Sequence, residues 1–166
     1  MRKTIVGVMG GSSADEATTE RARQLGAEIA RHGWVLLSGG RPTGVMQASI
    51  TGAKEAGGLT VGVLFDDDHS LAAEDLDIVI PTGMGAARNI INILSSDVVV
   101  ACCGSGGTLS EIALALRFER PVVLLDFDPG DAFLRAAGTN PRFSHAKTAT
   151  EAAEQIAGFL KELGRD

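Results

Sequence analysis

The chain has 166 residues, a formal net charge of −6, 45% hydrophobic residues and 4% aromatic residues. This length suits one domain with an adequate hydrophobic core. The acidic balance, with cations scattered along the sequence, argues against a broad surface for DNA or RNA. No apolar stretch is long enough to span a bilayer, and Met1-Arg2-Lys3 runs into a predicted strand without a secretory segment. We therefore expect a cytoplasmic protein with no nucleic-acid or membrane partner.

The first half of the chain alternates predicted strands and helices. Residues 4–9 form an apolar run typical of a strand covered on both faces. Ser13 to Glu16 resembles a capping box and opens a helix that ends at Gly33. Its buried stripe is predicted at Ala22, Leu25, Gly26 and Ile29. A strand at 34–37, a helix at 44–56, a strand at 60–65, an acidic loop and a strand at 77–80 follow.

The second half continues the alternation after a glycine-containing turn at 81–85. A helix over 84–95 is predicted to bury one face, made of Ala87, Ile90, Ile91 and Leu94. A strand at 97–102, a helix at 107–118 and a strand at 121–125 come next. Residues 126–145 have no regular pattern, and a second capping box, Thr148 to Glu151, opens the last helix.

This order of elements predicts right-handed βαβ units and hence an α/β fold. We expect a single Rossmann-like, doubly wound domain over residues 1–166, with a mainly parallel sheet of about six or seven strands. In such sheets, ligands bind beyond the carboxyl ends of the strands, near the point where the strand order reverses.

Three glycine-rich turns each join a predicted strand to a helix. They are Gly10-Gly11-Ser12-Ser13, residues 38–44 and residues 104–108. Glycine permits close approach of a ligand, and the following helix directs its positive dipole end at the turn. The turns therefore predict a shared rim of backbone N–H groups for phosphate or another anion. The candidate binding residues are Gly10, Gly11, Ser12, Gly39, Gly40, Arg41, Thr43, Gly44, Gly104, Ser105, Gly106, Gly107 and Thr108.

Common cofactor motifs do not fit these turns. The first turn lacks G-x-G-x-x-G and the second strand lacks a terminal acidic residue, which argues against NAD. The third turn lacks the lysine of a P-loop. His32, His69 and His145 lack metal-ligand spacing, so we predict no metal site. For His69, which follows three aspartates, an exposed acidic loop and contact with a divalent ion both remain open.

Two charged residues are candidates for chemistry, and each has a structural alternative. Arg88 lies near a predicted helix N-terminus, where it either faces a bound anion or turns into solvent. Glu111 either faces the rim or closes a capping box with Thr108. Arg41 either meets a phosphate or is a solvated loop cation. The hydroxyls of the turns either bind an anion or cap their own helices.

The two cysteines, Cys102 and Cys103, are adjacent at the end of a predicted strand. A disulfide between neighbours is strained, so both are expected to be free. Burial as small apolar residues and contact of one thiol with the ligand are the two interpretations.

The turns together resemble the LOG-like (SLOG) Rossmannoid superfamily. The motifs that carry the resemblance are Ser38 to Met46, Gly85-Ala86-Ala87-Arg88-Asn89 and Gly104 to Glu111, which occur in the family's order over nearly the whole chain. The sequence is most similar to bacterial proteins related to molybdenum cofactor carriers. More distantly it resembles the LOG (Lonely Guy) phosphoribohydrolases, often labelled lysine decarboxylases, although nothing here suggests a pyridoxal phosphate (PLP) site.

The hydrolase branch has the motif P-G-G-x-G-T-x-x-E and an upstream arginine. By position these imply Glu111 and Arg88 as catalytic residues and Gly106-Gly107-Thr108 as the phosphate cradle. The implied reaction is N-glycosidic cleavage of a nucleoside 5′-monophosphate to free base and ribose 5-phosphate. Cys103-Gly104-Ser105 replaces the Pro-Gly-Gly start, and Asn89 stands where the hydrolases usually have lysine. Both departures put the hydrolase activity in doubt and leave the anion cradle intact.

The carrier branch implies a binding role rather than chemistry. Its members hold the phosphorylated pterin of the molybdenum cofactor and protect its oxidation-sensitive dithiolene until delivery. The expected ligand is therefore a small phosphorylated pterin or nucleotide. The resemblance also implies a homodimer or homotetramer, with contacts through the helices over 84–95 and 107–118.

Overall fold

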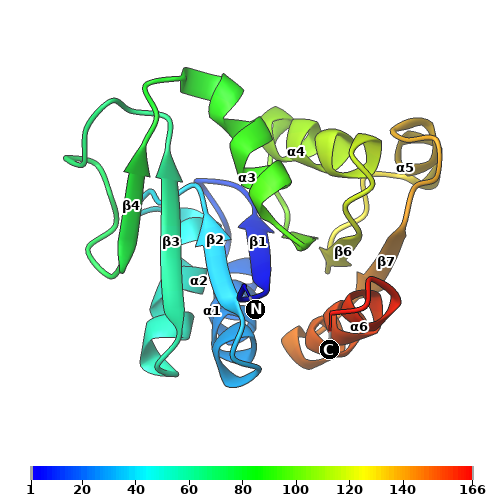
Figure 1. Cartoon of the computed structure of the whole chain (residues 1–166), viewed down its shortest axis with the longest axis horizontal. Coiled ribbons are helices and arrows are strands. Elements are labelled where there is room, and N and C mark those ends of the chain that lie inside the picture. Colours follow the sequence, from blue (N-terminus) through cyan, green and yellow to red (C-terminus); the bar gives the residue numbers. More distant parts are fainter. Residues whose placement is uncertain (1, 166) are drawn as a thin grey trace.

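Seven parallel strands form one sheet in the order β4-β3-β2-β1-β5-β6-β7, in a computed structural model that describes residues 2–165 (Figure 1). The strands are β1 (Ile5–Met9), β2 (Val35–Ser38), β3 (Leu59–Leu64), β4 (Ile78–Pro81), β5 (Val98–Ala101), β6 (Val122–Leu125) and β7 (Phe143–Ala146). From β1 the chain first runs to one edge and then, from β5, to the other. The strand order therefore reverses between β1 and β5, and the predicted single, doubly wound α/β domain is confirmed.

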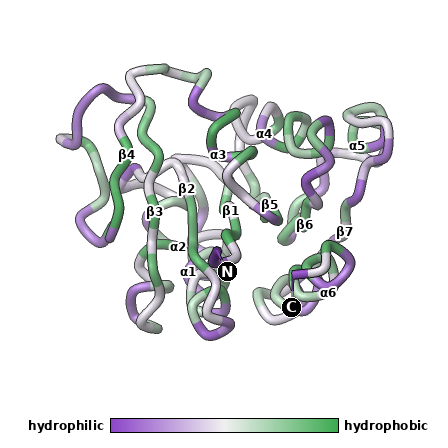
Figure 2. Tube along the Cα trace, in the orientation of Figure 1, coloured by the Kyte–Doolittle hydropathy of each residue, from purple (hydrophilic) through white to green (hydrophobic). Residues whose placement is uncertain are grey.

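Helices cover both faces of the sheet. They are α1 (Glu16–Arg31), α2 (Gly44–Glu55), the 3₁₀ turn η1 (Gly85–Arg88), α3 (Asn89–Ser95), α4 (Gly106–Arg117), α5 (Asp131–Ala136) and α6 (Ala149–Glu162). Successive strand residues point to opposite faces. One core packs α1, α2 and α6 against residues such as Val8 and Val100, and a second packs α3, α4 and α5 against Met9 and Val99. Figure 2 shows the resulting near-continuous hydrophobic strands.

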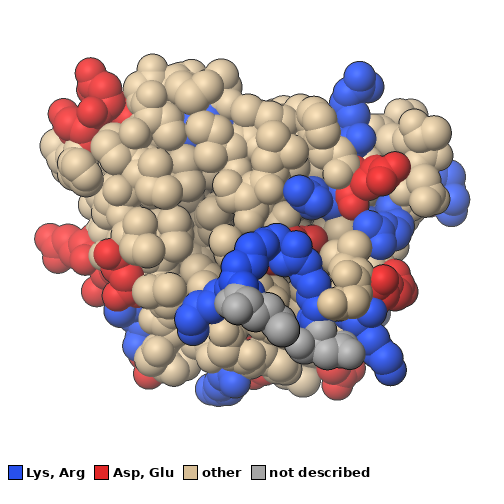
Figure 3. Space-filling model, in the orientation of Figure 1, with Lys and Arg blue, Asp and Glu red and all other residues tan. Residues whose placement is uncertain are grey.

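Cations that are far apart in the sequence come together near the N-terminus (Figure 3). Arg2 and Arg165 each lie 2.7 Å from the same carboxylate oxygen of Asp97, whose side chain is 4% exposed. The Asp97 carboxylate also accepts the backbone N–H of Ile5. These ion pairs tie the two described ends of the chain to the start of β5. None of the helices within residues 2–165 is both long and apolar enough to cross a membrane.

Several predicted helix boundaries are wrong. Asp15, not Ser13, is the N-cap of α1, because its carboxylate accepts the Thr18 backbone N–H at 2.7 Å. The predicted helix over 84–95 divides into η1 and α3, since Gly85 has φ +56° and starts a tighter turn. This break changes the helical phase, so α3 buries Asn92 and Ile93 while Leu94 is exposed.

The remaining differences concern the second half of the chain. Residues 126–145 contain α5 and all but the last residue of the edge strand β7, and these elements are too short to give a clear period. Ser105, not Thr108, is the N-cap of α4, so the predicted capping box with Glu111 does not form. Half of the capping box before α6 is confirmed, because the Thr148 hydroxyl accepts the Glu151 N–H. The Glu151 carboxylate accepts the N–H of Lys147, one residue before the N-cap.

Helices α1 and α2 pack closely against each other at two glycines. A Cβ on Gly26 would collide with the Ser49 carbonyl oxygen, and one on Gly52 would collide with the Arg23 carbonyl oxygen. The two backbones therefore touch with no room for side chains. This contact fixes α2, and hence the turn between β2 and α2, relative to α1.

We expect Gly52→Ala to lower the free energy of unfolding by about 1–3 kcal/mol, because overpacking outweighs the better helix propensity of alanine. Gly158→Ala on α6 is the matched control. A Cβ there meets no atom within 4 Å, so this substitution should stabilise by up to about 1 kcal/mol. Denaturant unfolding of both variants measures the difference, and equal stability would show that the α1–α2 contact is loose.

Candidate ligand-binding site

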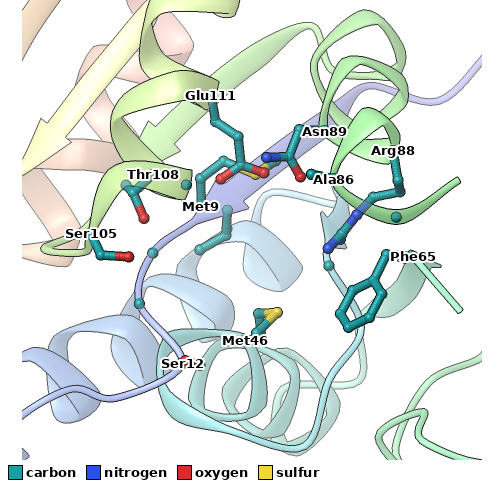
Figure 4. Close-up of a pocket in the computed structure, with 16 residues that line it drawn as sticks. Met9, Ser12, Met46, Phe65, Ala86, Arg88, Asn89, Ser105, Thr108 and Glu111 are labelled. Carbon is teal, nitrogen blue, oxygen red and sulfur yellow. The ribbon is translucent and has the colours of Figure 1, made fainter.

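A cavity of about 460 Å³ lies at the carboxyl ends of β1, β2 and β3, beside the reversal of strand order (Figure 4). We call it the ligand cavity. Its lining residues are Val8, Met9, Gly10, Gly11, Ser12, Gly39, Met46, Phe65, Gly85, Ala86, Arg88, Asn89, Ser105, Gly107, Thr108 and Glu111. Ser105, Thr108 and Glu111 come from α4 and its N-cap, and they lie across the cavity from Arg88 and Phe65 (Figure 4).

The turn after β1 holds the other two glycine turns in place. The Gly11 N–H donates to the Cys103 carbonyl at 3.0 Å, and the Gly11 carbonyl accepts the Val45 N–H at 3.1 Å. Side chains would prevent this approach, since a Cβ on Gly44 would collide with the Gly11 carbonyl oxygen and one on Gly104 with the Thr108 hydroxyl. Gly44 and Gly104 therefore serve the packing of the turns.

The N-terminus of α4 forms the first wall of the cavity. Its N-cap residue, Ser105, makes no side-chain capping bond, and its first turn contains no acidic residue. The first N–H to join the helical pattern is that of Leu109, which donates to the Ser105 carbonyl at 3.1 Å. The backbone N–H groups of Gly106, Gly107 and Thr108 precede it and have no helical acceptor. This end of the helix is thus suited to an anion.

Arg88 forms the opposite wall. Only 8% of the residue is exposed, and one terminal nitrogen, Nη1, donates to the Val63 carbonyl at 2.8 Å. Its Nε is buried without a hydrogen-bond partner among the described residues. A Cβ on Gly39 would lie 2.5 Å from Nη1, so the guanidinium rests directly on this turn. Burial lowers the pKa of Arg88, and the charges of Glu111 and Asp66 oppose that change.

Glu111 lies in the same cavity and is 8% exposed. Its carboxylate Oε1 accepts the Asn92 side-chain amide at 3.4 Å. Burial raises the pKa of Glu111 from an ordinary value of 4.5 to about 7, against the opposing effects of the Asn92 hydrogen bond and the Arg88 charge. The site therefore combines a fixed cation with an acid that changes charge near neutral pH.

The structure brings most of the predicted site residues together. Those that line the ligand cavity are Gly10, Gly11, Ser12, Gly39, Arg88, Ser105, Gly107, Thr108 and Glu111. Gly40, Arg41, Thr43, Gly44, Gly104 and Gly106 are not among its lining residues. Thr43 and Gly44 line a neighbouring cavity that shares Ser12.

Arg41 pairs with an acidic residue and is not among the lining residues of the ligand cavity. Its guanidinium lies 3.1 Å from the Asp66 carboxylate and 4.5 Å from the centre of the Phe65 ring. It thus stacks on the lining residue Phe65, with about a quarter of its side chain exposed. Of the cysteines, Cys102 is buried and its pKa is raised to about 12, while Cys103 is exposed outside the ligand cavity.

Sequence reasoning missed the apolar lining. Met9 and Met46 line the cavity with polarisable thioethers, and Phe65 contributes a flat aromatic ring. The sequence could have indicated Phe65, because this residue directly follows a buried strand, at the sheet edge where ligands bind. Met46 lies in the first turn of α2, and the sequence contained no signal for its place in the cavity. Among residues 2–165, no three His, Cys, Asp or Glu side chains are grouped to hold a metal ion.

Comparison with known proteins agrees with the turn motifs. Residues 3–157 match the SLOG cluster4 family. The chain belongs to this family. A molybdenum cofactor binding protein from Rippkaea orientalis is 45% identical, with a TM-score of 0.90 over 96% of this chain and 99% of that one. The molybdenum cofactor carrier protein from Chlamydomonas reinhardtii is 42% identical, with a TM-score of 0.87 over the same shares of the two chains.

The chain is also similar to a protein of the phosphoribohydrolase branch. A cytokinin riboside 5′-monophosphate phosphoribohydrolase from Mycobacterium tuberculosis is 34% identical over 115 residues, which are 64% of this chain and 62% of that protein. The SLOG cluster4 chain is therefore similar over almost its full length to the cofactor-binding proteins and over a shorter part to the hydrolase.

The raised pKa of Glu111 has a consequence for stability. Below about pH 4 the residue is protonated in both the folded and the unfolded chain. As pH rises, the unfolded chain loses this proton first, so the folded state loses up to about 3 kcal/mol by about pH 8. Glu111→Gln removes this loss, and its free energy of unfolding should exceed that of the wild type increasingly as pH rises.

Denaturant unfolding across this pH range measures the effect. Glu154→Gln, at an exposed position on α6, is the matched control. Curves for Glu111→Gln and the wild type that stay parallel would contradict a raised pKa at Glu111.

Proposed function

We propose that this SLOG cluster4 protein binds a small phosphorylated heterocycle, and that it acts as a carrier of a molybdenum-cofactor-type pterin. The observation that carries the proposal is the pairing, across one cavity, of the free α4 N-terminus with the buried and partly unpartnered Arg88 guanidinium. The full-length likeness to the two cofactor-binding proteins supports the pterin over other heterocycles.

The residues present fit such a ligand. The N–H groups at the start of α4 would hold the phosphate, with the Ser105 and Thr108 hydroxyls beside them. Met9 and Phe65 offer apolar surface to a flat ring. Gly10 and Gly39 let neighbouring side chains pack directly on the turns, because a Cβ at either position would lie within 3 Å of Val45 or Arg88.

The charged groups suit the polar edge of a pterin. Glu111 can accept hydrogen bonds from the amino and ring N–H groups, and Asn89 lies on the same cavity wall. The unpartnered Arg88 Nε can donate to a ring carbonyl or to the anionic part of the ligand. Enclosure by these groups would exclude water and oxidants from the dithiolene and molybdenum, which are cargo and not part of the protein.

A LOG-like phosphoribohydrolase is the second candidate function. The observation that favours it is Glu111, since a carboxyl of pKa about 7 in a ligand cavity suits acid–base work. In that mechanism Glu111 would stabilise the oxocarbenium-like ribose or activate water, and Arg88 would orient the substrate. Asn89 in place of lysine and Cys103-Gly104-Ser105 in place of Pro-Gly-Gly favour the carrier.

Self-association remains a proposal that accompanies either function. Large apolar side chains are exposed on the two predicted contact helices or at their ends. Met84 and Leu94 are each 47% exposed and Phe118 is 43% exposed. The partly buried Ile90 and Ile91 extend this surface along α3. Such a surface suits a second copy of the chain.

Anaerobic purification followed by mass spectrometry tests the carrier function. We expect the wild type to retain a phosphorylated pterin and Arg88→Lys to bind it at least about tenfold more weakly, because lysine does not reproduce the guanidinium fork. Thermal unfolding of Arg88→Lys controls for a structural defect. The same preparations, incubated with nucleoside 5′-monophosphates, should release no free base.

Release of free base by the wild type, abolished in Glu111→Gln, would overturn the carrier function and establish the hydrolase. Glu111→Gln is a suitable control because glutamine retains an acceptor for the Asn92 amide.

A further inference from the structure

A second cavity, of about 350 Å³, adjoins the ligand cavity. It lies between the turn after β1, the start of α1 and the turn before α4. Ser13, Asp15, Thr18, Cys103 and Gly104 are among its lining residues. Gly11, Ser12 and Ser105 line both cavities. The two cavities therefore share a wall, and Gly104, predicted as a binding residue, lies on the second one.

The shared wall includes the N-terminus of α4, where the proposed function places the phosphate. Ser105 is the N-cap of α4, and its hydroxyl makes no capping bond. Ser105 and Ser12 lie at one end of the ligand cavity, away from Arg88 (Figure 4). A phosphate at the α4 N-terminus is consequently placed at the junction of the two cavities. The Gly11 N–H is already bonded to Cys103, so the junction is held rigidly.

The second cavity has chemistry unlike that of the first. Its charged group is Asp15, and the hydrogen bond from the Thr18 backbone N–H lowers the pKa of this carboxyl. Asp15 thus stays ionised at neutral pH and attracts hydroxyl or amine donors. The Ser13 and Thr18 hydroxyls lie on the same walls. An ionised carboxylate repels a further phosphate, so the group that fits here is an uncharged polyol such as a ribose.

We propose that the site takes a ligand with two arms joined by a pyrophosphate, the heterocyclic arm in the ligand cavity and a ribose-bearing arm in the second cavity. This inference rests on the proposed function and narrows its ligand class to dinucleotide-type molecules. The pyrophosphate lies at the start of α4, the heterocycle extends toward Phe65 and Arg88, and the ribose hydroxyls face Asp15. A ligand that ends at its first phosphate would leave the second cavity unused.

Calorimetric titration with AMP, ADP and ADP-ribose tests the inference. ADP-ribose should bind at least about tenfold more tightly than AMP, because its second ribose fills the second cavity. ADP should bind no more tightly than AMP, because its terminal phosphate meets Asp15. Asp15→Asn keeps an effective N-cap and removes the charge, so it should reduce the preference for ADP-ribose over ADP.

A cavity-filling pair of variants gives an independent readout. Cys103 is exposed on the wall of the second cavity. Cys103→Trp should bring the ratio of ADP-ribose to AMP affinity close to one, whereas Cys103→Ser, with no larger side chain, should retain the ratio. Thermal unfolding confirms that both variants fold.

Equal affinity of the wild type for AMP and ADP-ribose would overturn the inference, as would an unchanged ratio in Cys103→Trp. Failure of all three nucleotides to bind would overturn it as well. The proposed function fails separately, when the anaerobically purified protein retains no phosphorylated pterin.

Discussion

Two backbone hydrogen bonds at Gly11 hold the site together. Its N–H bonds to the turn after β5 and its carbonyl to the first turn of α2. One residue therefore joins three turns that are distant in the sequence but follow neighbouring strands of the sheet. Because the contacts are between backbones, they require glycine at positions 44 and 104 and leave α4 with its N-terminus facing the cavity. The anion-binding N-terminus of α4 therefore owes its position to the packing of the three turns.

The electrostatics of the cavity explain how an acidic protein can bind an anion. The net charge is −6, but the groups that face the ligand are a helix N-terminus and one guanidinium. Burial strengthens the interaction of the Arg88 charge with an anion, since water screens it little. Glu111 opposes them only when it is ionised, and burial raises its pKa to about 7. The same burial that makes Glu111 costly to the fold therefore favours an anionic ligand at and below neutral pH.

Strand and helix order, and the convergence of the turns, could be predicted from the sequence because they follow from local patterns. Apolar runs mark strands that are covered on both faces, and glycine marks the turns at their carboxyl ends. Glu111 shows where such patterns become ambiguous. Thr108 to Glu111 satisfies the capping-box pattern, yet the helix begins at the preceding glycines and Glu111 falls one turn inside it. Local sequence does not distinguish these registers, since the cap position depends on packing against Gly11.

Arg88 and Arg41 show a second limit of the sequence. Both are loop or helix-end cations with similar local surroundings, but one is buried in the cavity and the other pairs with Asp66. Their places depend on contacts with β3 and the loop that follows it, which lie far away in the sequence. Likewise Asn92 is buried only because η1 interrupts the helix and rotates α3. Such residues are decided by tertiary contacts, not by spacing.

The central claim is that the α4 N-terminus and Arg88 bind one anionic ligand together. Titration of ¹⁵N-labelled protein with AMP, whose phosphate and flat ring can reach both groups, followed by NMR, tests it most directly. We predict saturable shifts of the backbone amides of Gly106, Gly107 and Thr108, together with the Arg88 Nε–H signal. Shifts confined to other parts of the protein, or no saturable shift at these groups, would contradict the account.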